Sequence, residues 1–181
     1  MKAVKLASAA LGLIIGVLAA VPANAWDRGS AEVYAYLPGG QRVEGLAVGP
    51  TTLPMGDQGK IYAASNGGTT PNLFVIPSTG CPMCTIQTLR ITGGGAPGVS
   101  NNLLGVEFTP ENPPKLLVID SGNAQVLNVD RTNGAASVFM TIPAANRPNA
   151  TLNAMTFANG NVYVSDSTNG AIWTMPLSTA G

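Results

Sequence analysis

One pattern occurs three times along the chain and constrains its fold more than any other feature. Each copy contains three short apolar segments separated by turns rich in Gly, Asn and Asp, and the copies cover residues 43–76, 104–129 and 152–175. The period is about 50 residues, which is typical of the blades of a β-propeller. The repeat therefore predicts an all-β fold that is built from propeller blades.

A fourth, half-exposed strand follows each of the first two copies. Residues 85–91 and 137–142 alternate, or nearly alternate, apolar with polar side chains, as an outer strand does when one of its faces meets water. With these strands the predicted four-stranded blades cover about residues 43–91, 103–142 and 152–181, and the third copy has no fourth strand of its own.

Residues 31–37 show the same alternation and lie ahead of the first copy. In many propellers an N-terminal strand completes the last blade and so protects the sheet edges, which predicts a closing strand here. Closed propellers have about 4–8 blades, so three blades predict part of a larger ring. Two interpretations stay open: the N-terminal half of a six-bladed chain, or two copies that associate through open blade edges.

The start of the chain has the features of an export signal. Lys2 and Lys5 form a basic start, residues 6–21 are uncharged and mostly apolar, and residues 23–25 read Ala-Asn-Ala, a small-x-small cleavage pattern. The apolar run is shorter than the roughly 20 residues that a membrane-spanning helix needs. An uncleaved anchor is the alternative interpretation.

We therefore predict a signal peptide over residues 1–25 that is cleaved between Ala25 and Trp26. The mature chain, residues 26–181, would then lie in the periplasm or outside the cell, without a membrane span. Because the two basic residues leave with the signal, acidic residues outnumber basic ones by two in the mature chain. Such a balance argues against a nucleic-acid partner.

The chain contains no histidine. This absence excludes Ser-His-Asp and Cys-His catalytic groups, histidine general bases and histidine-ligated zinc within these 181 residues. No catalytic residue can be assigned from the sequence.

Glu44 is the first candidate site residue. It stands at the start of a predicted inner strand, directly before Gly45, where a side chain either points into the central channel or faces solvent. The stretch from Glu32 to Gly45 reads E-V-Y-A-Y-L-P-G-G-Q-R-V-E-G. It resembles the opening of the senescence marker protein (regucalcin)/gluconolactonase family, where an outer strand that ends in Leu-Pro precedes a Glu on the first inner strand. NHL-type and strictosidine-synthase-like propellers share similar motifs.

The resemblance implies a six-bladed propeller with one divalent metal ion, commonly calcium, at the mouth of its channel. Glu44 corresponds to one metal ligand of the family, and a carboxylate suits such a hard cation. Asn153 resembles the Asn of a second ligand motif, although Ala154 replaces the Gly that follows it in the family. Its alternative role is an ordinary turn hydrogen bond. In the family, a third ligand and general base, an Asp, lies on a later blade.

Two further motifs have structural interpretations. The sequence Asp-Ser-x-Asn occurs at residues 120–123 and 166–169, where we interpret it as a tight turn and not as a calcium loop, because Asp and Asn bond nearby backbone N–H groups. Cys81 and Cys84 form a C-x-x-C pair between two strands. An exported compartment favours a local disulfide between them, and a labile redox pair is the alternative.

Two hypotheses for the function follow. The first is an exported, metal-dependent hydrolase that acts on a small lactone or ester, as the family resemblance implies. The alternative is a non-catalytic extracytoplasmic propeller that binds a protein, peptide or glycan on its loop face. The absence of histidine and the low fraction of charged residues, 10%, favour the alternative.

Overall fold

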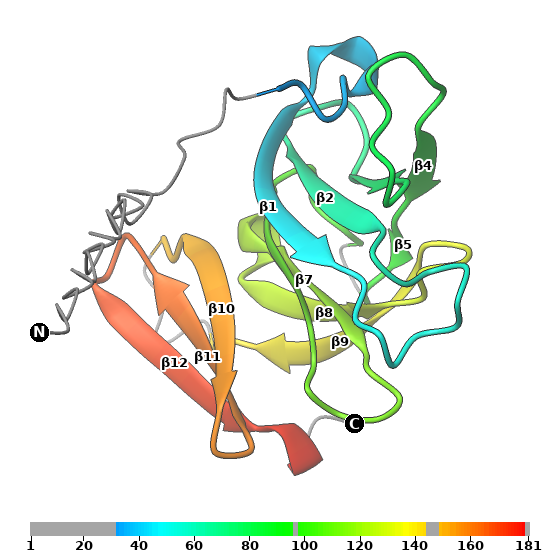
Figure 1. The fold of residues 1–181 in the computed structure, drawn as a ribbon. Helices are drawn as coiled ribbons and strands as arrows, with labels where there is room; N and C mark the ends of the chain where they lie inside the picture. Colours follow the sequence, from blue (N-terminus) through cyan, green and yellow to red (C-terminus); the bar gives the residue numbers. More distant parts are fainter. Residues whose placement is uncertain (1–31, 96–97, 144–148, 180–181) are drawn as a thin grey trace, which may run out of the picture. The chain divides into compact units, whose positions relative to one another are not determined.

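The computed structural model describes residues 32–95, 98–143 and 149–179 of the chain, and its compact unit starts at Val33. Regular structure in this part consists of β-strands and short 3-10 turns, grouped in chain order into three sheets (Figure 1). Within the described ranges, no helix has the length and hydrophobicity to cross a membrane. The predicted signal peptide and its cleavage site lie outside them.

The first sheet, blade 1, is an antiparallel meander of four strands. They are β1 (Arg42–Val48), β2 (Ile61–Asn66), β3 (Asn72–Ile76) and β4 (Gln87–Arg90), and they pair in this order. The middle strands β2 and β3 are mostly apolar and almost wholly buried, whereas in β4 only Leu89 is buried. An outer strand with one face in water exposes its polar residues in this way.

The second sheet, blade 2, repeats this meander. Its strands are β6 (Leu103–Phe108), β7 (Leu116–Asp120), β8 (Gln125–Val129) and β9 (Ala135–Thr141). The short strand β5 (Thr92–Gly93), which follows β4, adds to the outer edge of this sheet by parallel pairing with β9. The chain therefore crosses from blade 1 to blade 2 along the outer rim.

The third sheet, blade 3, has three strands: β10 (Leu152–Ala158), β11 (Asn161–Asp166) and β12 (Ala171–Pro176). Among the described residues, no strand pairs with the outer edge of β12. Blades 1 and 2 each contain a four-stranded antiparallel meander, whereas blade 3 has three strands within the described ranges.

Two apolar cores fill the spaces between the blades. The first joins side chains of blade 1, such as Tyr62, to side chains of blade 2, such as Val118. The second joins blade 2, through Ile119, to blade 3, through Val164. Val118 and Ile119 are fully buried neighbours on β7 that serve different cores, because successive side chains of a strand point to opposite faces.

Two glycines allow the inner strands of neighbouring blades to approach each other closely. A Cβ atom at position 45 would overlap the backbone of β6 at Leu104, and one at position 105 would lie 2.9 Å from the Asn153 carbonyl oxygen of β10. Only a residue without a Cβ fits at such an approach. The corresponding residue of blade 3 is Ala154.

The segment ahead of β1 lies against blade 1. Residues 31–37 are expected to form a closing strand for the last blade of a propeller, and Ala31 lies outside the described ranges. Within residues 32–37, Ala35 forms a β-bridge with Cys81, and this bridge joins the segment to blade 1. The Tyr34 hydroxyl donates to the Ser78 carbonyl oxygen at 2.6 Å, which fixes the segment on the same blade.

Candidate functional site

The best candidate site lies at the ends of the blades where β1, β6 and β10 begin and β2, β7 and β11 end. We refer to this side as the loop face. Because neighbouring strands are antiparallel, the start of each inner strand lies next to the end of the following strand. Arg42 of β1 is paired with Asn66 of β2, for example. Backbone contacts also link the blades here, since the Gly67 amide donates to the Asn101 carbonyl oxygen at 2.8 Å and Asn66 forms a bridge with Asn102.

Glu44 lies on the loop face at an irregularity of β1. The register with β2 shifts between Val43 and Gly45, and such a bulge re-aims the side chain that it carries. The Glu44 side chain is exposed, and its Oε1 accepts a hydrogen bond from the Asn66 amide at 3.4 Å.

Asn153 occupies the equivalent place on β10, where the register shifts between Leu152 and Met155. Its side chain is exposed, and its amide donates to Ser167 Oγ at 3.4 Å. The equivalent residue of the intervening strand β6 is Leu104, which is buried. Glu44 and Asn153 therefore hold matching positions on blades 1 and 3, with an apolar residue on blade 2 between them.

The fit of a metal ion to these residues can be judged from their donor atoms. Calcium takes six to eight oxygen ligands, and Glu44 and Asn153 supply one carboxylate and one amide carbonyl. Within the described ranges, no group of three or more His, Cys, Asp and Glu side chains is placed to hold a metal ion. The two residues by themselves are therefore an incomplete ligand set.

Each of the two Asp-Ser-x-Asn segments begins with a buried aspartate, Asp120 or Asp166. The Asp120 carboxylate accepts hydrogen bonds from the Ser100 backbone amide, the Ser100 hydroxyl and the Asn123 side chain. Asp120 thus ties the β7–β8 turn to the segment that leads into β6. Its hydrogen-bond partners are internal, as expected of a structural turn.

Asp166 repeats the arrangement in blade 3. Its carboxylate accepts from the Thr151 amide at 3.1 Å, from Asn169 Nδ2 at 2.8 Å and from Trp173 Nε1 at 3.3 Å. Burial on its own would raise the pKa of Asp166, but the hydrogen bonds from Asn169 and Trp173 outweigh this effect and hold the pKa below its ordinary value of 3.8.

A polar groove of about 280 Å³ opens on the loop face beside Glu44. The residues that line it are Gly39, Gln41, Arg42, Asn66 and Gly67. Gln41 Oε1 is buried and has no hydrogen-bond partner among the described residues. Buried acceptors are normally paired, so this oxygen, which lies close to Gly68, is an unsatisfied acceptor on a residue that lines the groove.

This groove was not anticipated from the sequence, although a signal for it exists. Gln41 and Arg42 directly precede the first predicted strand of the repeat, and Asn66 and Gly67 directly follow the second. Because antiparallel pairing sets these two ends side by side, their polar residues meet. The predicted candidate Glu44 lies next to the groove through its contact with Asn66.

The cysteine pair lies away from the loop face, in the connection between β3 and β4. Cys81 and Cys84 form a disulfide with a Cα–Cα distance of 5.2 Å. Cys81 is buried, whereas the Met83 side chain between the two cysteines is almost fully exposed. The pair therefore belongs to the rim of blade 1 and contributes nothing to the polar groove.

Comparison with known proteins gives structural neighbours alone. No family model matches the chain, and no curated protein matches its sequence. A solved structure of a catalytically inactive virginiamycin B lyase from Staphylococcus aureus, with quinupristin, is similar with a TM-score of 0.51 and 15% identity. A Bacteroides caccae protein of unknown function is similar with a TM-score of 0.50 and 11% identity.

These neighbours, together with the three sheets, decide the fold. The chain is built from β-propeller blades. Each match covers 80% of this chain, but only 45% of the lyase and 46% of the Bacteroides protein. The chain thus spans less than half the length of both structures, and identities this low show the fold alone.

Proposed function

We propose that this chain is a non-catalytic β-propeller module that binds a peptide segment in the polar groove of the loop face. The observation that carries the proposal is the buried, unpaired Oε1 of Gln41, a residue that lines the groove. Rotation of the Gln41 side chain toward the groove would let a peptide N–H satisfy this acceptor, and the side-chain amide of Asn66 offers both a donor and an acceptor to the same backbone.

The charges around the groove support a ligand without large net charge. Arg42 lines the groove and Glu44 lies beside it, so one positive and one negative side chain flank the amides. The absence of histidine from the chain supports binding over acid–base catalysis. We also propose export to the periplasm or the cell exterior, on the basis of the signal-like sequence of residues 1–25.

Selection from a random peptide library on the full chain tests this proposal, and Gln41→Leu is the decisive variant. We expect the selected peptides to bind at least about 10-fold more weakly to this variant, because a lost hydrogen bond in a buried site costs about 1–3 kcal/mol. Gln87→Leu on the exposed strand β4 is the matched control and should leave binding unchanged. Equal binding by both variants, or selection from a glycan array in place of peptides, would refute the peptide site.

A metal-dependent hydrolase of a lactone or ester, similar to the regucalcin/gluconolactonase family, is the second candidate. The matching positions of Glu44 and Asn153 on β1 and β10 favour it. Calcium titration by calorimetry separates the two candidates, with Glu44→Gln as the control. Calcium binding that is lost in Glu44→Gln would support the hydrolase, and equal, negligible heats in both proteins would remove its basis.

The lyase activity of the structural neighbour is not proposed for this chain. In that structure the enzyme is inactivated by replacement of a histidine with alanine, and this chain contains no histidine. Propellers host many unrelated functions, so the shared fold does not transfer the reaction.

A further inference from the structure

Blade 1 carries, on the face away from blade 2, an apolar pattern that blades 2 and 3 use for packing. Strand pairing assigns six equivalent positions in each blade. In blade 2 these positions, all buried against blade 1, are Val106, Phe108, Leu116, Val118, Leu127 and Val129. In blade 1 the same positions are Leu46, Val48, Ile61, Ala63, Phe74 and Ile76.

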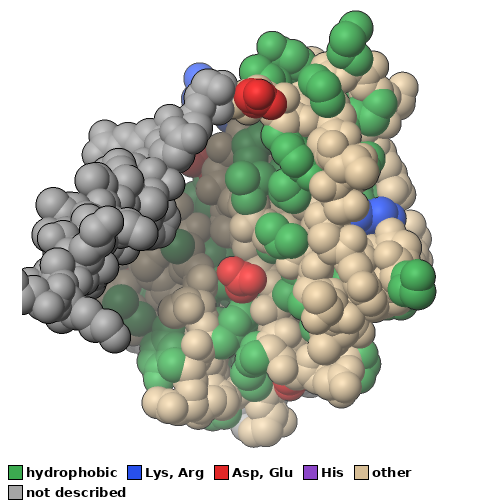
Figure 2. All heavy atoms as spheres, in the orientation of Figure 1, with side chains coloured by type: hydrophobic (Ala, Val, Ile, Leu, Met, Phe, Trp, Pro, Cys, Tyr) green, Lys and Arg blue, Asp and Glu red, His purple; other side chains and the backbone are tan. Residues whose placement is uncertain are grey.

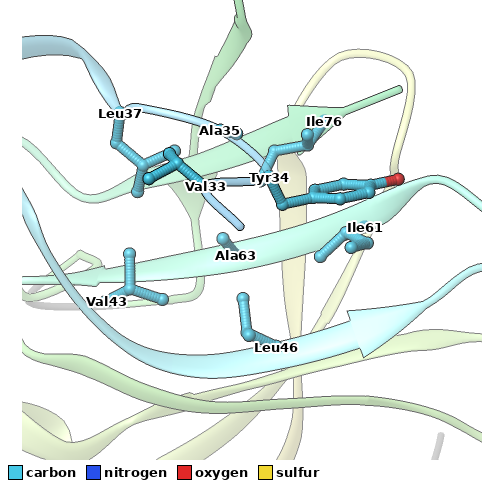
Figure 3. A pocket seen from close by; sticks show the side chains of 9 residues that line it. All are labelled: Val33, Tyr34, Ala35, Leu37, Val43, Leu46, Ile61, Ala63 and Ile76. Carbon is cyan, nitrogen blue, oxygen red and sulfur yellow. The ribbon is translucent and has the colours of Figure 1, made fainter. Parts of the chain in front are cut away.

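All six positions of blade 1 are thus apolar. Ala63, Phe74 and Ile76 are buried in a small cluster with Cys81, Ile86 and residues ahead of β1, whereas no blade among the described residues covers the inner part of the face. Leu46 and Val48 on the inner strand are 60% and 61% exposed. Residues 33–37 lie along the outer part of the face and leave an apolar groove of about 360 Å³ (Figure 3). Hydrophobic side chains also gather over β1 in the space-filling view (Figure 2). Such a surface marks an interaction site.

Blade 3 presents the complementary face. Ala154, Thr156, Tyr163, Ser165 and Ile172 line a shallow groove of about 160 Å³, and none of them is charged. Ile172 is 70% exposed. Tyr163 holds the position in blade 3 that Tyr62 holds in blade 1. The Tyr62 ring packs edge-on against the Phe108 ring of blade 2, with 5.3 Å between the ring centroids. The residue of blade 1 that matches Phe108 is the exposed Val48.

We propose that a second copy of this chain covers both faces, so that blade 3 of each copy packs against blade 1 of the other. One chain carries both halves of this contact, and two such contacts related by a two-fold axis close without leaving a free face. The resulting six blades fall within the range of about 4–8 that closed propellers use.

The lengths of the structural neighbours agree with this assembly. This chain matches 45% of the lyase and 46% of the Bacteroides protein, so two copies supply nearly the length of one such protein. Neither groove contains a charged side chain, so no uncompensated charge would be buried. The assembly is independent of the proposed peptide site, which lies within one copy.

Ala154 makes the contact between copies looser than the contacts within a chain. At the other two junctions Gly45 and Gly105 face the backbone of the next inner strand. By the same pattern, the Ala154 methyl group would face the backbone of Glu44 in the second copy and hold the strands apart. We therefore expect reversible dimers, and we expect Ala154→Gly to lower the dissociation constant.

Sedimentation equilibrium and native mass spectrometry of the full chain at micromolar concentration are the first test. We expect twice the mass of one chain, as a closed pair requires. A monomer over the whole concentration range, or open-ended oligomers, would overturn the proposal.

Two charge substitutions then identify the faces. Leu46→Glu on blade 1 and Ile172→Glu on blade 3 should each raise the dissociation constant by at least about 100-fold, because each places an unpaired charge in both junctions of a dimer. Met55→Glu, at a side chain that is 90% exposed in the β1–β2 loop, is the control and should not change it. A dimer that persists in Ile172→Glu would instead show contact between two copies of blade 1, against the proposal.

An equimolar mixture of the two variants provides a test that misfolding cannot mimic. One junction of the mixed dimer combines the wild-type blade 3 of the Leu46→Glu chain with the wild-type blade 1 of the Ile172→Glu chain. We expect the mixture to dimerise more strongly than either variant alone. A mixture that remains monomeric would overturn the pairing of blade 3 with blade 1.

Discussion

At the scale of single residues, Gly105 determines how closely blades 2 and 3 approach each other. A Cβ atom at this position would lie 2.7 Å from Ile119 Cδ1 and 2.9 Å from the Asn153 carbonyl oxygen. We expect Gly105→Ala to lower the free energy of unfolding by about 1–3 kcal/mol, the usual cost of overpacking. Urea denaturation of this variant measures the loss.

Gly56→Ala is the matched control for this prediction. A Cβ atom at position 56 would have no heavy atom within 4 Å, so the variant should be neutral or slightly stabilising because it restricts the unfolded chain. If Gly105→Ala and Gly56→Ala had the same free energy of unfolding, the prediction would be wrong, because the space between β6 and β10 would then accommodate a methyl group without cost.

Asp166 makes the stability of blade 3 depend on pH. Its pKa in the folded protein lies below the ordinary value of 3.8, because hydrogen bonds from Asn169 and Trp173 outweigh the effect of burial. A lowered folded pKa contributes stability above the unfolded pKa, and this stability is lost as the pH falls through the folded pKa. We expect the free energy of unfolding to decrease below about pH 4, as measured by urea titrations at several pH values.

Asp166→Asn should make this acid dependence shallower, since it removes the titrating group. Asp57, whose pKa is also lowered, contributes a separate part: burial would raise that pKa, but the side chains of Arg131 and Lys60 outweigh it. An acid slope unchanged by Asp166→Asn would assign the dependence to other carboxylates.

At the scale of elements, the β3–β4 connection links strands β3 and β4 to the segment ahead of β1. The disulfide closes the loop from Cys81 to Cys84, and the Cys81 amide donates to the Tyr34 carbonyl oxygen of the segment ahead of β1 at 2.7 Å. The connection therefore orders both the outer hairpin and residues 33–37.

We expect reduction of this disulfide to lower the free energy of unfolding by about 1–2 kcal/mol, because a loop this short gains little from cross-linking. Denaturation with and without a phosphine reductant measures the change, and Met83→Ser, in the same turn, controls for local sequence effects. Identical unfolding curves under both conditions would show that the turn is ordered without the disulfide.

Strands that are buried between blades could be predicted from the sequence, whereas the position of the segment ahead of β1 could not. The strands of the repeat were anticipated because their apolar periodicity reflects burial between blades, as Val118 and Ile119 illustrate on β7. Residues 33–37 have the alternation of an outer strand, yet they form one bridge with blade 1. Alternation indicates that one face is buried, but it does not identify the partner sheet.

At the scale of the whole molecule, blade 2 holds the three sheets together. Each face of blade 2 belongs to a different apolar core. One core joins blade 2 to blade 1, and the other joins it to blade 3. Asp57 of blade 1 adds an ion pair with Arg131 of blade 2 at 2.9 Å. The exposed apolar groups of blade 1 and blade 3 have no such neighbour among the described residues, and this is the physical basis of the proposed dimer.

The sequence by itself determined the all-β class and the division into propeller blades, because the burial period and the turn residues are local features of the chain. It also pointed to Glu44 and Asn153, which lie at equivalent positions in β1 and β10, and their role as metal ligands stays a prediction. Only the tertiary structure placed residues 33–37 on blade 1. The sheet that such a segment contacts depends on how the sheets pack, and no local pattern encodes that choice.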